Sequence, residues 1–145
     1  MSLVTQTAQA VAAELNRQKF SQEFEAVYRV KPAYELSELD TLRVIVVPKT
    51  LEIERVSRSS VKYTVTVDVG ILRRIGKAAP EEAVETLGTL VDEIAEFLAE
   101  TTLSEFRAAT FAEVVNDPVY VPEHLTTDRT FTSVLSVKYA MAGGH

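Results

Sequence analysis

The stretch VKYTVTVDVGI, residues 61–71, alternates apolar and polar side chains. A period of two predicts a β-strand with one buried face. Strands usually have about 5–6 residues, so this one is long. The apolar face holds Val61, Tyr63, Val65, Val67, Val69 and Ile71, and the other holds Lys62, Thr64, Thr66 and Asp68.

Further strands are predicted on both sides of this stretch. Residues 23–30 alternate in the same way, with Phe24 and Tyr28 on the apolar face. Residues 42–47 are nearly all apolar, which indicates a strand covered on both faces and ended by Pro48. The other predicted strands are 51–54, 112–115 and 131–139.

Two helices are predicted. The first lies within residues 1–20, where apolar side chains recur every three or four positions and Ser2 is placed to cap the N-terminus. The second starts at Pro80, which is followed by two acidic residues that favour a helix N-terminus, and it ends near Glu100. Residues 119–123 are predicted to be extended, because one proline precedes them and another interrupts them.

The order of these elements is α-β-β-β-β-α-(β)-β. Consecutive strands with only two helices are typical of an α+β fold, here a largely antiparallel, mixed β-sheet packed by two α-helices. No repeat, low-complexity segment or linker divides the chain. Residues 1–145 are therefore expected to form a single domain, with a frayed tail at 142–145.

Composition excludes several classes of protein. The 145 residues are 46% apolar and 25% charged, as in ordinary globular domains. A net charge of −6 argues against binding nucleic acid by phosphate neutralisation. Without cysteine, disulfides, thiolate metal sites and thiol nucleophiles are excluded. The chain shows no bilayer-spanning apolar run and no signal peptide, so a cytoplasmic product without membrane contact is expected.

Residues that carry catalytic or metal chemistry are sparse. His124 is the one internal histidine, and it has no set of partners for a zinc site or for general base catalysis, so loop packing or an interface is its alternative role. Paired carboxylates such as Glu23/Glu25 and Glu52/Glu54 suit acid–base work or Mg²⁺, but solvated strand faces have the same pattern. The chain has no glycine-rich phosphate loop. No catalytic, cofactor-binding or metal-ligating residue is predicted, and the residue types that remain indicate interaction surfaces.

Several strings along nearly the whole chain are structural rather than catalytic. They are residues 36–40 (LSELD), 42–48 (LRVIVVP), 51–54 (LEIE), 63–69 (YTVTVDV), 116–120 (NDPVY), 122–125 (PEHL) and 131–139 (FTSVLSVKY). Together with the N-terminal helix, the strand with Phe24 and Tyr28, and the acidic start of the helix at Pro80, they resemble the tail terminator (tail completion) proteins of tailed bacteriophages, of which the lambda type is the best-known shape.

The resemblance implies a structural virion protein of the tail and neck, made in the host cytoplasm. Such a protein forms a homohexameric ring on the last ring of the tail tube, stops tube polymerisation, and offers a surface to a head-closure, neck or connector protein. DNA would pass through the ring without specific binding, in keeping with the negative net charge. Two alternatives remain: another neck or head–tail connector subunit, and a small α+β ligand-binding domain or enzyme.

The predicted interface residues follow from this reading. An acidic first loop is expected to face the lumen or the tube, and a basic set is expected to meet acidic partners, where charge guides docking and register. The alternative is that both are solvated loops. The residues are Glu35, Glu38 and Asp40 in the loop, Glu52 and Glu54 on the hairpin, the basic Arg55, Arg58, Arg73 and Arg74, and Tyr120 and His124 in the proline-flanked segment.

Overall fold

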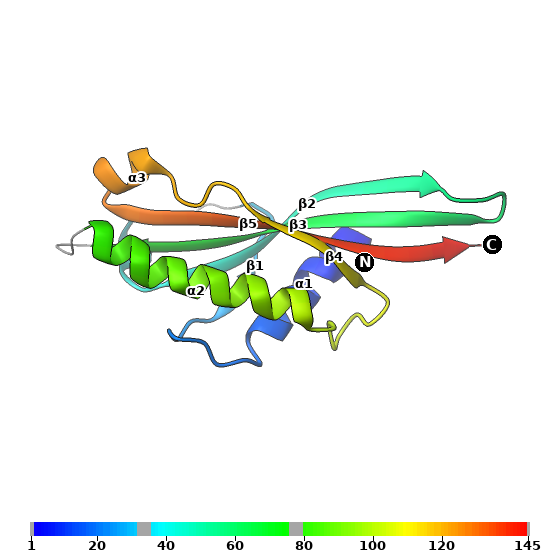
Figure 1. The fold of residues 1–145 in the computed structure, drawn as a ribbon, viewed down its shortest axis with the longest axis horizontal. Coiled ribbons are helices and arrows are strands. Elements are labelled where there is room, and N and C mark those ends of the chain that lie inside the picture. The colour runs from blue at the N-terminus through cyan, green and yellow to red at the C-terminus, as the bar shows by residue number, and fades with distance from the viewer. Residues whose placement is uncertain (1, 32–35, 76–79, 145) are drawn as a thin grey trace.

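The structure is a computed structural model that describes residues 2–31, 36–75 and 80–144 (Figure 1). Its elements are α1 (Leu3–Leu15), β1 (Ala26–Tyr28), the 3-10 helix η1 (Leu36–Asp40), β2 (Arg43–Arg55), β3 (Ser60–Arg74), α2 (Pro80–Glu100), β4 (Thr110–Asn116), α3 (Pro122–Thr126) and β5 (Thr130–Gly144).

The strands form one mixed sheet in the order β1-β2-β3-β5-β4. Only the β1–β2 pair is parallel, so the predicted α+β fold with a largely antiparallel sheet is confirmed. The long strand predicted at 61–71 is the central strand β3, and it pairs with β5 from Ser60↔Gly144 to Arg74↔Thr130. The 142–144 stretch is therefore paired and not frayed, because β3 gives it a partner, while His145 lies outside the described residues.

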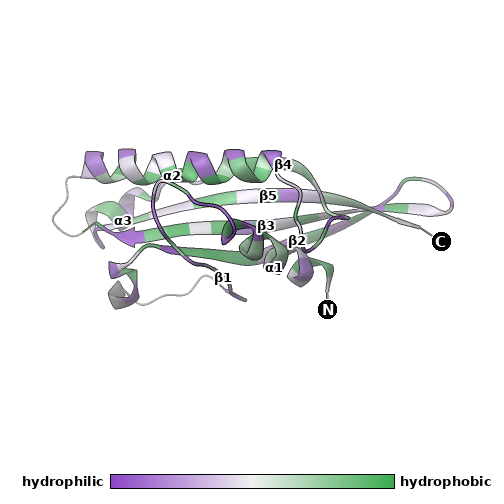
Figure 2. Ribbon diagram, turned by 90° about the horizontal axis from the view of Figure 1, so that it is seen from below, coloured by the Kyte–Doolittle hydropathy of each residue, from purple (hydrophilic) through white to green (hydrophobic). Residues whose placement is uncertain are grey.

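Helices α1 and α2 cover the same face of the sheet. Apolar residues of both helices join one buried cluster with the alternating residues of the strands, among them Val67 of β3 and Val137 of β5, both fully buried. In α2 the side that faces the sheet is apolar and the outer side is polar, as Figure 2 shows. The predicted second helix is confirmed from Pro80 to Glu100, and Ile94 is among its fully buried residues.

The first half of β2 is buried on both faces, as predicted. Val44 and Val46 belong to the cluster under the helices, and Ile45 on the opposite face is 1% exposed. The Ile45 side chain lies over Gly70, where an added Cβ would be 3.1 Å from Ile45 Cγ1. A glycine at this position of β3 therefore makes room for Ile45.

Three predictions about the strands are wrong. Pro48 does not end a strand: β2 is one strand that passes it with an irregular register between Pro48 and Thr50, so three strands precede α2 and not four. Proline is tolerated here because β1 pairs only with Val44–Val46 and leaves this part of β2 at an edge. Of residues 23–30, only Ala26–Tyr28 form a strand, β1. These three residues are the ones that pair with β2.

The other corrections concern helix ends. Ser2 caps α1, its Oγ accepting from Thr5 N at 3.2 Å, but α1 ends at Leu15 and not at residue 20. There Asn16 turns the chain, because its side-chain amide donates to Ala26 O and accepts from Ala26 N at 2.9 and 2.8 Å. Residues 122–126, predicted as extended up to 123, form α3, with Pro122 at the first helical position that proline suits.

Candidate interaction surfaces

Beyond the helices the sheet continues as a narrow extension, which we call the outer ribbon: residues 50–55 of β2, the turn 56–59, residues 60–64 of β3 and 141–144 of β5. Figure 1 shows it projecting past α1, α2 and β4. Every side chain from residue 49 to residue 59 is exposed. The turn is closed by backbone hydrogen bonds from Val56 N and Ser57 N to Ser60 O, of 3.1 and 3.2 Å.

The outer ribbon carries apolar side chains that nothing in the described part of the chain covers. Leu51, Ile53 and Val56 are 42%, 61% and 64% exposed. Leu51 pairs with Val65 and Ile53 pairs with Tyr63, so both lie on the face that the helices cover further along the sheet. The alternation at 51–54 predicts that Leu51 and Ile53 share one face of the strand. Their exposure is not predicted by it, because it depends on how far the helices extend along the sheet.

Four of the predicted interface residues lie on the outer ribbon. Glu52 and Glu54 are on the face opposite the helices, where Glu54 pairs in register with Lys62 of β3. Arg55 ends β2 and Arg58 is in the turn. The ribbon thus combines charges of both signs with the apolar side chains described above.

A groove of about 500 Å³ runs beside the end of β5 on the outer ribbon. Ala140, Met141 and Ala142 line it, and these three consecutive residues of one strand point alternately to the two faces. Val56 of the turn, Val61 of β3 and Ala108, which precedes β4, complete the apolar part of its wall. The groove therefore lies at the edge of β5, where β4 no longer pairs with it.

The opposite end of the sheet holds a different set of charges. The carboxylate Oδ1 of Asp40 in η1 lies 3.1 Å from Nη1 of Arg74 at the end of β3. Arg43 Nε donates to Glu38 O at 2.8 Å, which holds η1 against β2. The acidic first loop and the basic end of β3, predicted as separate surfaces, meet here, while Glu35 of that loop lies outside the described residues.

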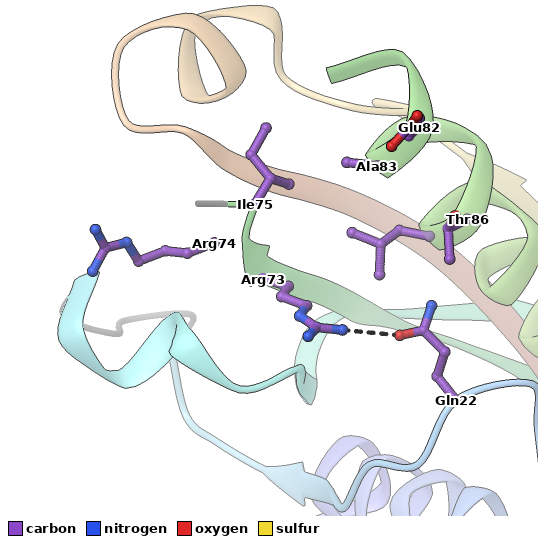
Figure 3. A pocket seen from close by; sticks show the side chains of 8 residues that line it. Gln22, Arg73, Arg74, Ile75, Glu82, Ala83 and Thr86 are labelled. Atoms are coloured by element: carbon purple, nitrogen blue, oxygen red, sulfur yellow. Dashed lines mark hydrogen bonds between the residues drawn. The ribbon is translucent and has the colours of Figure 1, made fainter. Parts of the chain in front are cut away.

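Arg73 and Arg74 leave β3 in different directions, as Figure 3 shows. Arg74 extends toward η1, whereas Nη1 of Arg73 donates to Gln22 Oε1 at 3.1 Å. Gln22 and Arg73 line a pocket of about 260 Å³ together with the first turns of α2, including Glu82 and Thr86. The lining includes both arginines and the acidic Glu82, so this pocket has no single sign of charge.

Tyr120 precedes α3 and His124 lies within it, also away from the outer ribbon. His124 Nδ1 is 2.9 Å from Thr132 Oγ1 of β5, which fits the loop-packing alternative for this histidine. Tyr120 is 37% exposed and its neighbour Val119 is 56% exposed. The side-chain amide of Asn116 donates to Val134 O at 2.8 Å and to Ser133 Oγ at 3.0 Å, and so fixes the start of this segment on β5.

The predicted interface residues therefore form two groups and not one. A strand rises about 3.3 Å per residue, so the two ends of the 15-residue β3 are roughly 45 Å apart. Glu52, Glu54, Arg55 and Arg58 are at the outer end, and the other described members are at the inner end. The residues that sequence reasoning missed as surface candidates are the exposed apolar side chains of the outer ribbon, above all Val56.

One buried polar group lies in the core and not at a surface. Tyr139 of β5 is fully buried, and its hydroxyl has no hydrogen-bond partner among the described residues. Burial raises the pKa of the Tyr139 phenol well above its usual value, and the Glu14 carboxylate raises it further. Glu14 Oε1 accepts a hydrogen bond from Ser104 N at 2.8 Å, which ties α1 to the segment after α2.

No protein-family model and no curated protein matches this sequence. Among the described residues, no group of three or more histidines and acids is placed to hold a metal ion. A search of the same residues finds no helix with the length and apolar character that crossing a bilayer requires.

Proposed function

We propose that this protein is a ring-forming structural subunit of a bacteriophage virion, a tail terminator that caps the tail tube and joins it to the neck. The observation that carries the proposal is the outer ribbon, where Leu51 and Ile53 of β2 and Val56 of the turn are exposed beyond the part of the sheet that the helices cover. Exposed apolar side chains on a regular sheet edge are typical of surfaces that contact another protein.

The difference between the two ends of the sheet supports the choice of a terminator. The outer ribbon presents apolar side chains and free strand edges, whereas the inner end presents the Asp40–Arg74 ion pair and the Tyr120 segment. Copies that assemble head to tail around one axis build a ring with two unlike faces when these ends point to opposite sides. A terminator needs this property, because one face binds the last tube ring and the other binds a head-closure, neck or connector protein.

The charge of the chain fits the passage of DNA. A net charge of −6 leaves the ring without the excess of basic side chains that would hold phosphates. In this proposal the protein resides in the virion, between tail and head, and works by shape and docking and not by catalysis. No cofactor takes part.

A tube-growth experiment tests the proposal. Tail-tube protein from the same phage is polymerised with and without this protein, and tube lengths are measured by negative-stain electron microscopy. We expect the tubes to be shorter in the sample that contains this protein, with extra density at one end of each tube. Tubes that grow to the same length in both samples would contradict termination, and rings that form without binding tube ends would favour another neck role.

The charged groups at the two ends sharpen this test. Arg55→Glu with Arg58→Glu alters the outer ribbon, and Glu38→Lys with Asp40→Lys alters the inner end by a charge change of equal size and opposite sign. We expect the first pair to impair head–tail joining, and the second to leave rings intact while DNA passage slows. Normal infectivity of phage carrying the first pair and of phage carrying the second would show that neither group has the role proposed for it.

A further inference from the structure

We propose that the partner of the outer ribbon is a second copy of this chain, joined by strand pairing: the free edge of β2, residues 50–55, lies along the free edge of β5, residues 141–144, of the neighbouring copy. The inference rests on the proposed ring and names the contact between its subunits.

Two strand edges on the outer ribbon have no partner in the described part of the chain. On the outer side of β2, strand β1 pairs only with Val44–Val46, which leaves residues 50–55 open. On the outer side of β5, strand β4 pairs with residues 135–140 and leaves 141–144 open. The inner sides of both stretches are paired with β3. Such open edges present backbone N–H and C=O groups that can pair with an added strand.

The direction of the strands determines how copies can join. Because β2 and β5 are both antiparallel to β3, they are parallel to each other. A parallel β5–β2 pair between copies therefore continues the sheet with every copy in the same orientation. Each copy offers one edge and accepts the other, which is a heterologous contact that closes into a ring when the rotation per copy divides a full turn.

The side chains at the two edges are complementary in shape and in polarity. The groove at the end of β5 is lined by Val56, Val61, Ala140 and Met141 of the same copy, and it reaches Ala108 and Thr110 beside the free stretch of β5. An arriving β2 would bring Leu51 and Ile53, the side chains that lie bare in the single copy. Their burial in the groove removes apolar surface from water on both copies.

Charge complementarity supports the same pairing on the opposite face. There the arriving strand carries Glu52 and Glu54, and the receiving edge presents Ala142, which is exposed and small. Ala142 pairs in register with Lys62 on the next strand. An acidic side chain placed beside Ala142 can therefore extend toward the Lys62 ammonium, whereas a pair of β5 edges would bring no such opposite charge.

Disulfide trapping tests the pairing, because the chain has no cysteine of its own. Paired strands lie about 4.8 Å apart, within the separation of roughly 4.4–6.8 Å that disulfides span between Cα atoms. Glu52→Cys and Glu54→Cys are each combined with Ala142→Cys, so that two registers on the same face are sampled. Controls are the three single variants and Glu54→Cys with Val115→Cys, whose second thiol lies on β4.

We expect mild oxidation of one Ala142 double variant to give a ladder of covalent multimers that ends at the copy number of the ring. Single variants and the Val115 control should stay uncrosslinked. Dimers from a single variant would overturn the proposal, because they indicate a symmetric edge. If rings assemble but neither double variant gives a ladder, the strand pairing is overturned and the proposed ring is not. Protein that stays monomeric at every concentration would overturn both this pairing and the proposed function.

Discussion

The two halves of β2 differ both in sequence and in surroundings, since the first half is almost wholly apolar and the second half alternates apolar and polar side chains. Before Pro48, residues Val44–Val47 are at most 8% exposed, whereas Leu51 and Ile53 after it are 42% and 61% exposed. The register with β3 continues through both halves, so the pairing does not explain the difference. The difference comes from the layers around the sheet, because α1 and β1 contact the first half and nothing described covers the second. The exposed Leu51 and Ile53 on the helix side of this strand therefore point to a contact with a partner.

The largest expected effect is a charge placed in the buried cluster that the first half of β2 shares with the helices. Ile94→Asp on α2 puts a carboxylate where the native side chain is fully buried, and no described basic residue belongs to the cluster around it. We expect a loss of about 5 kcal/mol or more in the free energy of unfolding, which is enough to unfold a typical domain. Soluble expression and thermal melting measure this effect.

Ile53→Asp is the matched control in the bare half. The native side chain is 61% exposed, so the new carboxylate remains solvated and the free energy of unfolding should fall by less than about 1 kcal/mol. Equal losses in the two variants would show that the outer ribbon is covered in the folded protein, and the comparison between the halves of β2 would fail.

A second prediction concerns the assembly of copies and not the stability of the single chain. Leu51→Ser with Ile53→Ser removes the two bare apolar side chains on the helix side of β2. We expect the concentration needed for assembly to rise at least about tenfold, because roughly 1.4 kcal/mol of apolar burial per contact is lost. Sedimentation velocity across a dilution series measures it. Unchanged assembly would place the contact elsewhere on the molecule.

Alkaline pH tests the buried core through the phenol of Tyr139 on β5. In the unfolded chain the Tyr139 phenol ionises near pH 10, but in the folded protein its pKa is raised by burial and by Glu14. The folded state therefore keeps a proton that the unfolded state loses, and the free energy of unfolding falls as pH rises above about 10. Urea unfolding of wild type and Tyr139→Phe between pH 8 and 11 should show a shallower decline in the variant. Parallel declines would contradict a raised pKa.

The smallest expected effect is at the inner end of the sheet. Asp40→Asn removes one charge of the Asp40–Arg74 ion pair, whose side chains are 68% and 42% exposed. Exposed ion pairs contribute about 0–1 kcal/mol, so we expect a loss of less than about 1 kcal/mol that shrinks further in high salt. Chemical denaturation at two salt concentrations measures it. A loss as large as that of Ile94→Asp would mean that the inner end is part of the core.

The sheet and its covering helices were predictable because their signals are local. Alternation over 61–71 gives β3 and its buried face, and the three-and-four spacing after Pro80 gives α2. Pro48 was misleading, because a proline usually ends a strand. Whether β2 continues past Pro48 depends on its pairing with β3, and the local sequence of β2 does not show that pairing. Pro122 was ambiguous for a similar reason, because proline suits both an extended segment and the first position of a helix.

The arrangement of the candidate surfaces was less predictable. The Asp40–Arg74 ion pair joins residues 34 positions apart, and nothing in their local sequence indicates that they meet. Alternation places Leu51 and Ile53 on one face, but it does not reveal whether a helix reaches them. The free edges of the outer ribbon depend on where β1 and β4 stop, which only the assembled sheet shows.

The central claim is that this chain assembles into a closed ring through the outer ribbon. The most direct measurement is native mass spectrometry of the purified protein, with negative-stain images of the same sample. We expect a closed species of six copies, which the Leu51→Ser, Ile53→Ser variant does not form at the same concentration. A chain that remains a monomer at every concentration, even beside tail-tube protein, would contradict the account.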